Sequence, residues 1–309
     1  MRWNRREIVS AAALAVAGCG RAHAEAQEPK MPTKPLLTRK VPASGEALPV
    51  VGLGTWQAFD VATGGPDWDQ AGEALAAFAR AGGRVVDSSP MYGRAEAAIG
   101  ALAAERGLRP DLFLATKVWT RGRAAGEAQI AASHDKLRAP VIDLMQVHNL
   151  LDLEVHMPTL RAAKAAGTIR YVGVTHYDES AYDALEAAMR RHELDFIQIN
   201  ASVAERSSEA RILPLAAERG LAVLINRPFA GGDLFGRVRR LPLPGWAAEI
   251  GATSWAQVLL KYVLANPAVT CAIPGTRNPC YVLDNLGAAT GPLPDAAQRR
   301  RIVEAVAAA

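Results

Sequence analysis

The fold is decided by three stretches of the sequence: RVVDSSPMYG (84–93), LFLATKVW (112–119) and IDLMQVHN (142–149). Each stretch contains a short apolar run that is typical of a buried β-strand, and helix-like segments separate the three runs. Regular alternation of this kind predicts parallel strands whose carboxyl ends emerge on one face of the sheet. Four ionisable side chains stand at or just after these strand ends, where we expect them to converge: Asp87, Tyr92, Lys117 and His148.

The same alternation continues to the end of the chain. It gives eight strand candidates, which are Val50–Leu53, Arg84–Asp87, Leu112–Thr116, Ile142–His148, Tyr171–Thr175, Phe196–Asn200, Ala222–Ile225 and Val269–Ile273. Helix ends are predicted at Gly82, Gly107, Gly167 and Gly220. The segment Gly52-Leu53-Gly54 lacks the third glycine of the dinucleotide-binding fingerprint, which argues against an open Rossmann sheet. We therefore predict an α/β fold, a (β/α)8 TIM barrel over residues 41–309 with an N-terminal β-hairpin around Ser44-Gly45.

The first 24 residues have the pattern of a signal peptide. Arg5-Arg6 precede an apolar run over residues 8–18, which resembles a twin-arginine export signal and is too short to span a bilayer. Two processing sites are open: a lipoprotein-type site, with lipid on Cys19, or cleavage after Ala24. Residues 25–40 are polar and Pro-rich, which predicts a flexible tether. The chain is thus expected to be exported, and to be periplasmic or lipid-anchored at the cell envelope.

The charge of the chain is concentrated in this N-terminal segment. Residues 1–24 carry +3 of the formal net charge of +4, which leaves +1 after Ala24. The basic balance therefore gives no support for nucleic-acid binding, and a membrane contact is expected only through a lipid at Cys19. Half of the residues are hydrophobic, so the chain can bury a core of the size that a barrel requires.

The four polar side chains form a set that could reduce a carbonyl group. Hydride transfer needs a proton donor for the oxygen, and Tyr92 could serve. Tyrosine has an ordinary pKa of ~10, but an ammonium group about 4 Å away contributes ~4 kcal/mol at an effective dielectric near 20. Lys117 is expected to supply this ammonium and Asp87 to keep it charged. A neutral His148 would hold the carbonyl oxygen.

Each of these residues alone also has a structural interpretation. Asp87 could cap the turn that follows it, and Tyr92 could pack on Met91. Lys117 could be a solvated charge at a strand end, and His148 could be an ordinary core histidine. Because all four occur together and in this order, the catalytic interpretation is favoured.

The motifs around these residues resemble those of the aldo-keto reductases. The resemblance is carried by Val51–Trp56, Val86–Gly93, Ala115–Trp119, Leu144–Asn149 and Gly167–Val174. It implies a (β/α)8 barrel that binds NADP(H) without a Rossmann domain and reduces small-molecule aldehydes and ketones to alcohols, with Tyr92 as general acid. It also implies that Trp56 and Trp119 line the substrate pocket. We expect a monomer and no metal site.

The resemblance further implies a set of cofactor-binding residues, namely Thr175, His176, Gln198, Arg227, Gly275, Thr276, Arg277 and Asn285. A loop that opens a helix offers N–H groups to a phosphate, and Arg277 adds a cation for a 2′-phosphate. Many family members carry a basic residue where this chain has Tyr281, so the preference for NADP rests mainly on Arg277. Thr175-His176 stands where the family usually has Ser-Asn.

Two other functions stay open at this point. The chain could be a cofactor-binding barrel with a regulatory or binding role and little turnover, a hypothesis that the unusual Thr175-His176 and Asn226-Arg227 pairs support. It could also be a metal-dependent hydrolase that uses Asp87, His148 and His176. This last hypothesis ranks behind the others because no His-x-His pair lies on an early strand.

Overall fold

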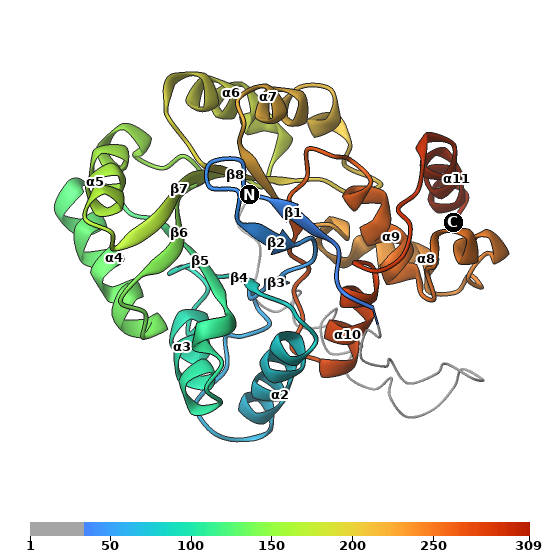
Figure 1. The fold of residues 1–309 in the computed structure, drawn as a ribbon, viewed down its shortest axis with the longest axis horizontal. Helices are drawn as coiled ribbons and strands as arrows, with labels where there is room; N and C mark the ends of the chain where they lie inside the picture. The colour runs from blue at the N-terminus through green and yellow to red at the C-terminus, as the bar shows by residue number, and fades with distance from the viewer. Residues whose placement is uncertain (1–33) are drawn as a thin grey trace, which may run out of the picture.

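The computed structural model describes residues 34–309. The predicted signal peptide (1–24), its Cys19 and most of the predicted tether lie outside the described residues. The described chain confirms the predicted architecture: parallel strands occupy the centre and helices surround them (Figure 1).

Eight parallel strands form the barrel wall in chain order. They are β3 (Leu53–Gly54), β4 (Val85–Asp87), β5 (Phe113–Val118), β6 (Ile142–His148), β7 (Ile169–Thr175), β8 (Phe196–Asn200), β9 (Ala222–Asn226) and β10 (Cys271–Ala272). The wall closes where isolated parallel bridges join Val51 to Ala272 and Gly54 to Gly275. A Cβ atom at Gly54 would lie 2.7 Å from the carbonyl oxygen of Ile273, so glycine permits this close approach. The first and last strands are shorter than predicted because pairing at this seam is confined to single bridges.

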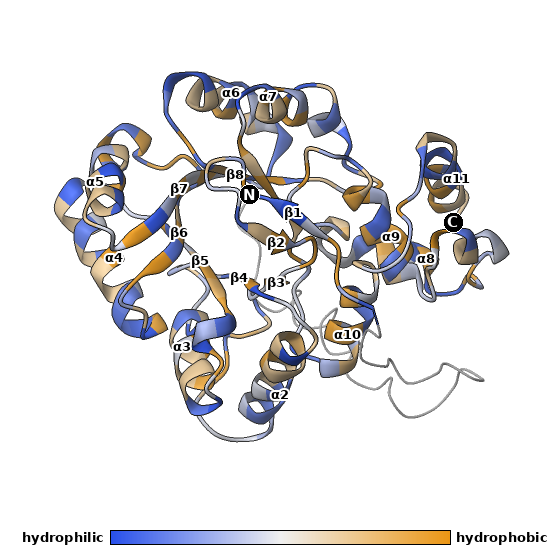
Figure 2. Ribbon diagram, in the orientation of Figure 1, coloured by the Kyte–Doolittle hydropathy of each residue, from blue (hydrophilic) through white to orange (hydrophobic). Residues whose placement is uncertain are grey.

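Helices cover the outside of the barrel. They are α2 (Pro66–Arg80), α3 (Ala95–Glu105), α4 (Arg123–Leu137), α5 (Leu153–Ala165), α6 (Tyr182–Arg191), α7 (Ile212–Glu218), α8 (Asp233–Val238), α9 (Trp255–Leu264), α10 (Pro279–Gly287) and α11 (Ala296–Ala307). The four predicted terminating glycines all adopt left-handed φ angles, which confirms these helix ends. Hydrophobic residues concentrate on the strands and hydrophilic residues on the outward side of the helices (Figure 2). Among the described helices, none combines the length and the apolar character that a membrane crossing would need.

A β-hairpin covers the amino-terminal end of the barrel. Strand β1 (Thr38–Lys40) pairs antiparallel with β2 (Ala47–Pro49), as the sequence predicts for the segment around Ser44-Gly45. Val41 and Leu48 of the hairpin join a buried cluster with residues near the strand starts, including Phe113. The predicted tether was too long, because Thr38–Lys40 belongs to this hairpin. Arg39 fixes the segment by donating hydrogen bonds to carbonyl groups at the end of α9.

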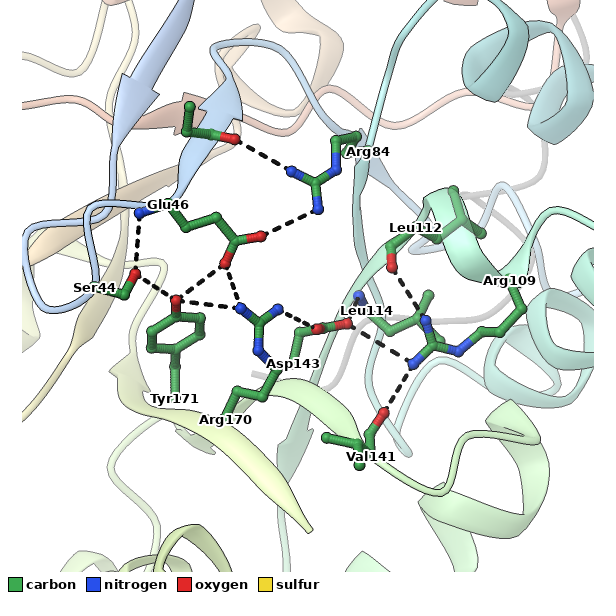
Figure 3. Close-up of polar contacts among 11 residues, drawn as sticks. Ser44, Glu46, Arg84, Arg109, Leu112, Leu114, Val141, Asp143, Arg170 and Tyr171 are labelled. Atoms are coloured by element: carbon green, nitrogen blue, oxygen red, sulfur yellow. Dashed lines mark hydrogen bonds and ion pairs between the residues drawn. The ribbon is translucent and has the colours of Figure 1, made fainter. Parts of the chain in front are cut away.

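A polar network ties this hairpin to the barrel (Figure 3). Arg170 donates to Glu46 at 2.6 Å and to Asp143 at 2.7 Å, and Tyr171 donates to Ser44 at 2.6 Å. Burial alone would raise the pKa of Glu46, but hydrogen bonds from Arg170 and Tyr171 lower it below its ordinary value. The carboxylate therefore stays charged. This network lies at the end of the barrel opposite to the predicted site.

Candidate active site

A buried ion pair lies at the centre of the predicted site. The Lys117 ammonium donates to Asp87 Oδ2 and to the Ser88 carbonyl oxygen, each at 2.6 Å. The side chains of Lys117 and Asp87 are 0% and 3% exposed, so almost no water screens the pair. Burial alone would lower the pKa of Lys117, but the facing carboxylate raises it, so the ammonium stays charged. Strands β4 and β5 bring these two predicted residues together.

Two amides and a hydroxyl complete the surroundings of Asp87. Gln198 donates to Asp87 Oδ1 at 2.8 Å, and Gln146 reaches the same oxygen at 3.3 Å. Thr175 in turn donates to Gln198 Oε1 at 3.1 Å. Thr175 and Gln198, both predicted to bind cofactor, thus also orient the carboxylate of the ion pair. Gln146 was missed, although it lies two residues before His148 and therefore on the same face of β6.

Tyr92 lies beside the ion pair, in the loop after β4. The Lys117 ammonium is 5.0 Å from the centroid of the Tyr92 ring. Burial raises the pKa of Tyr92 and outweighs the lowering by Lys117, so the net direction is upward. Lys117 thus lowers the pKa of Tyr92 as expected, but by less than burial raises it. The phenol remains protonated at neutral pH, which is the state that a general acid needs.

His148 lies at the end of β6 and faces Tyr92. The two rings are 6.0 Å apart and nearly perpendicular. Burial, together with the charge on Lys117, lowers the pKa of His148 to about 2, so the imidazole is neutral as predicted. Its Nδ1 lies 3.0 Å from Ser89 Oγ, and that oxygen also accepts the N–H of Met91 at 3.4 Å. The hydroxyl proton of Ser89 can be donated to Nδ1, and in that tautomer the ring hydrogen lies on Nε2, which is then a donor. Sequence reasoning missed this role of Ser89.

The strand ends beyond His148 carry further polar groups. His176 Nδ1 accepts the N–H of Asp178 at 3.2 Å, and its ring stacks on Tyr177 at a centroid distance of 5.5 Å. Because Nδ1 is an acceptor, Nε2 carries the hydrogen in the neutral ring. Asn226, at the end of β9, donates to the His176 carbonyl oxygen at 3.4 Å, while its Oδ1 is buried without a partner among the described residues. Asn226 Oδ1 is therefore available as a hydrogen-bond acceptor at this edge of the barrel.

The loop after β9 has a strained backbone. Arg227 and Ala230 adopt left-handed φ angles of 50° and 51°, which non-glycine residues rarely adopt. Gly231 and Gly232 follow in the same region at 73° and 105°. The Arg227 guanidinium lies 3.6 Å from Glu205, so the predicted cofactor cation has a carboxylate partner. Strain of this kind concentrates at functional loops.

The predicted phosphate-binding segment lies between the barrel seam and α10. Gly275 forms the closing bridge with Gly54. Thr276 Oγ1 accepts the N–H of Asn278, whose own side chain caps α10, so part of the expected free N–H set is used within the loop. Asn285 is buried in α10. Arg277 does not stand free: its guanidinium donates to side chains of α2.

Two large aromatic side chains line the mouth of the barrel. Trp56 and Trp119 are 53% and 40% exposed, which is unusual for tryptophan. The Trp119 ring lies 6.3 Å from His148 between centroids, so it borders the predicted reaction site. Trp56 is in the loop after β3, at the same end of the barrel. Exposed aromatic surface here suits an apolar part of a substrate.

The residues at this face fit a nicotinamide dinucleotide. Among the described residues Asn226 Oδ1 has no partner and can accept from an amide, His176 Nε2–H can donate, and Arg277 lies just before the N-cap of α10, where its cation suits a phosphate. No group of three His, Cys, Asp or Glu side chains that could hold a metal ion occurs in the part of the chain that the structure describes.

Comparison with known proteins agrees with this geometry. The family model "Aldo/keto reductase family" matches residues 50–306. The methylglyoxal reductase YeaE of Escherichia coli is 28% identical over 250 residues, which cover 77% of this chain and 84% of the relative. The NADH-specific methylglyoxal reductase of the same species is 27% identical over 231 residues, 64% of this chain and 68% of the relative.

A solved structure shows the same likeness. The aldo/keto reductase from Klebsiella pneumoniae, in complex with NADP and acetate, superposes with a TM-score of 0.71 at 27% identity. The match covers 84% of this chain and 91% of that one. Together with the family model over residues 50–306, it leads to one conclusion: the chain belongs to the aldo/keto reductase family.

Proposed function

We propose that this protein is an NADP(H)-dependent reductase that converts aldehydes or ketones to alcohols, with Tyr92 as the proton donor. The observation that carries the proposal is the cluster at the barrel mouth, where Tyr92 lies between the buried Lys117–Asp87 pair and a neutral His148. When bound, the reduced nicotinamide supplies the hydride. The related K. pneumoniae structure contains NADP, which supports this choice of cofactor.

The side chains of this chain have separate tasks in the proposed reaction. His148 Nε2–H donates to the carbonyl oxygen and holds it near Tyr92. As negative charge develops on that oxygen, the Tyr92 hydroxyl gives up its proton to it. Lys117 then stabilises the phenolate that is left, since its ammonium is charged and held close to the ring. Asp87 keeps Lys117 in place and compensates its charge.

The proposed cofactor residues surround this cluster. Thr175, His176 and Gln198 lie at the ends of β7 and β8, where a carboxamide can be hydrogen-bonded. Arg227 and the glycine loop after β9 suit a pyrophosphate, because positive φ angles let the backbone approach closely. Gly275, Thr276, Arg277 and Asn285 belong to the adenosine end in the same proposal.

One titration tests the proposal. Purified protein is titrated with NADPH and with NADH while tryptophan fluorescence is followed, and the loaded protein is then given a small aldehyde. We expect quenching with at least one nucleotide, followed by oxidation of the nucleotide at a rate that depends on the aldehyde. Binding without turnover on a broad set of aldehydes and ketones would favour a regulatory barrel, and no binding would refute the reductase function.

We further propose that the protein is exported and, separately, that it is a monomer. The proposal of export rests on the Arg5-Arg6 signal pattern in the sequence. Replacement of both arginines by lysine is expected to leave the protein in the cytoplasm of its host, as measured by cell fractionation. Metabolic labelling with a fatty acid, with Cys19→Ala as control, distinguishes lipidation from cleavage after Ala24. A mass above that of one chain in light scattering would contradict the monomer.

A further inference from the structure

Arg277 is held by a neighbouring helix. Its Nη2 lies 3.0 Å from Asp67 Oδ1, and its Nε donates to Gln70 Oε1 at 3.2 Å. Both partners belong to the first turns of α2, which lies beside the start of α10 (Figure 1). The Arg277 side chain is only 29% exposed, whereas that of Asp67 is 68% exposed. The cation that the proposed function assigns to a 2′-phosphate thus already has a carboxylate partner.

This pairing has a consequence for any anion that approaches Arg277. Asp67 and Gln70 occupy one Nη2 N–H and the Nε N–H of Arg277, which leaves the two Nη1 N–H groups and one Nη2 N–H for a 2′-phosphate. A 2′-phosphate on these groups would share the guanidinium with the Asp67 carboxylate, which stays nearby because α2 packs against α10. Like charges at such a distance repel each other. A ribose 2′-hydroxyl carries no charge and can even donate a hydrogen bond to Asp67.

We propose that Asp67 is a specificity-determining residue that reduces the preference for NADPH over NADH. The inference rests on the proposed function, because it assumes that a nicotinamide dinucleotide binds with its adenosine end near α10. Asp67 competes with the 2′-phosphate for Arg277, so the protein accepts NADH more readily than the presence of Arg277 alone would suggest. Loss of the Asp67 charge shifts the balance towards NADPH.

The alternative explanation is that Asp67 only stabilises α2. Acidic residues in the first turn of a helix interact favourably with the helix dipole. Asp69 provides a matched control, because it lies in the same first turn, is exposed and carries the same charge. No ion pair or hydrogen bond joins Asp69 to Arg277 in the described structure. Replacing Asp69 removes the same charge from the helix but leaves the Arg277 pair intact.

The experiment measures dissociation constants by calorimetry. NADPH and NADH are titrated into the wild type, Asp67→Asn and Asp69→Asn. Exposed ion pairs are weak, so we expect Asp67→Asn to tighten NADPH binding about three- to tenfold and to change NADH binding less than about twofold. Asp69→Asn should leave the ratio of the two constants within about twofold of wild type. The shift should shrink at high salt, because salt screens exposed charges.

A second background tests the route through Arg277. In an Arg277→Gln protein, Asp67→Asn is expected to tighten NADPH binding less than in the wild type, because the competition for Arg277 is absent and only the direct repulsion between Asp67 and the phosphate remains. An unchanged NADPH-to-NADH ratio in Asp67→Asn, or an equal shift in Asp69→Asn, would overturn the inference and leave the proposed function intact. Failure of all variants and the wild type to bind either nucleotide would overturn both.

Discussion

Replacing Lys117 by methionine is the perturbation whose effect follows most directly from the structure. Methionine has nearly the same shape but no charge, so the change removes the ammonium without opening a large cavity. Asp87 loses a partner at 2.6 Å, and the Ser88 carbonyl loses its donor at the same distance. A buried carboxylate is then left without a cation. Only the amide donors of Gln198 and Gln146 remain to it.

The expected loss of stability is large. Breaking a buried ion pair from one side costs about 3–5 kcal/mol. The two amide donors partly compensate Asp87, so we expect Lys117→Met to lower the free energy of unfolding by about 3 kcal/mol. In a domain of this size the loss corresponds to a fall in Tm of roughly 5 °C.

Urea unfolding followed by tryptophan fluorescence measures this effect. The control is the double variant Lys117→Met/Asp87→Asn, in which no buried charge remains. It should be more stable than Lys117→Met at pH 8. The reasoning is refuted if Lys117→Met is as stable as the wild type at pH 8, or if the double variant is no more stable than the single one.

Three further predictions concern other parts of the molecule. Ser89→Ala removes one neutral hydrogen bond to His148, so it should lower kcat about fivefold and leave nucleotide binding unchanged. An unchanged kcat would argue against a role for Ser89. Glu46→Gln should lower the free energy of unfolding by about 2 kcal/mol at pH 7, without effect on turnover. Because the pKa of Glu46 is lowered in the fold, this difference should vanish as the pH falls well below 4.5 in acid unfolding curves. Finally, kcat for reduction should be independent of pH from about pH 5 to 8, since the pKa of His148 is about 2 and that of Tyr92 is raised. A change in kcat centred near pH 6.5 would show that His148 titrates there.

Local patterns in the sequence were sufficient for most of the fold. Strand β6 has the predicted bounds, Ile142–His148, because a short run rich in apolar residues ends there in a polar residue. The lengths of the first and last strands were harder to predict. These strands meet at the seam, where Gly54 approaches Gly275 and the pairing consists of single bridges. The start of the hairpin was also misplaced, because the chain before Val41 looks polar and Pro-rich.

The members of the central cluster could be predicted because each follows a strand end. What could not be predicted were the partners, which lie far away along the chain. Ser89 and His148 are 59 residues apart, and Asp67 and Arg277 are 210 apart. The net direction of the pKa shift at Tyr92 was also not predictable. Burial raises this pKa and Lys117 lowers it, and the sequence does not show which of the two effects is larger.

The central claim is that Tyr92 donates the proton to a reduced carbonyl, and Tyr92→Phe tests it most directly. The measurement compares kcat for reduction of a small aldehyde with the dissociation constant of the nucleotide, in the wild type and in the variant. We expect kcat to fall at least about 100-fold, while nucleotide binding stays within about twofold. A variant that binds the nucleotide and reduces the aldehyde at the wild-type rate would contradict the claim.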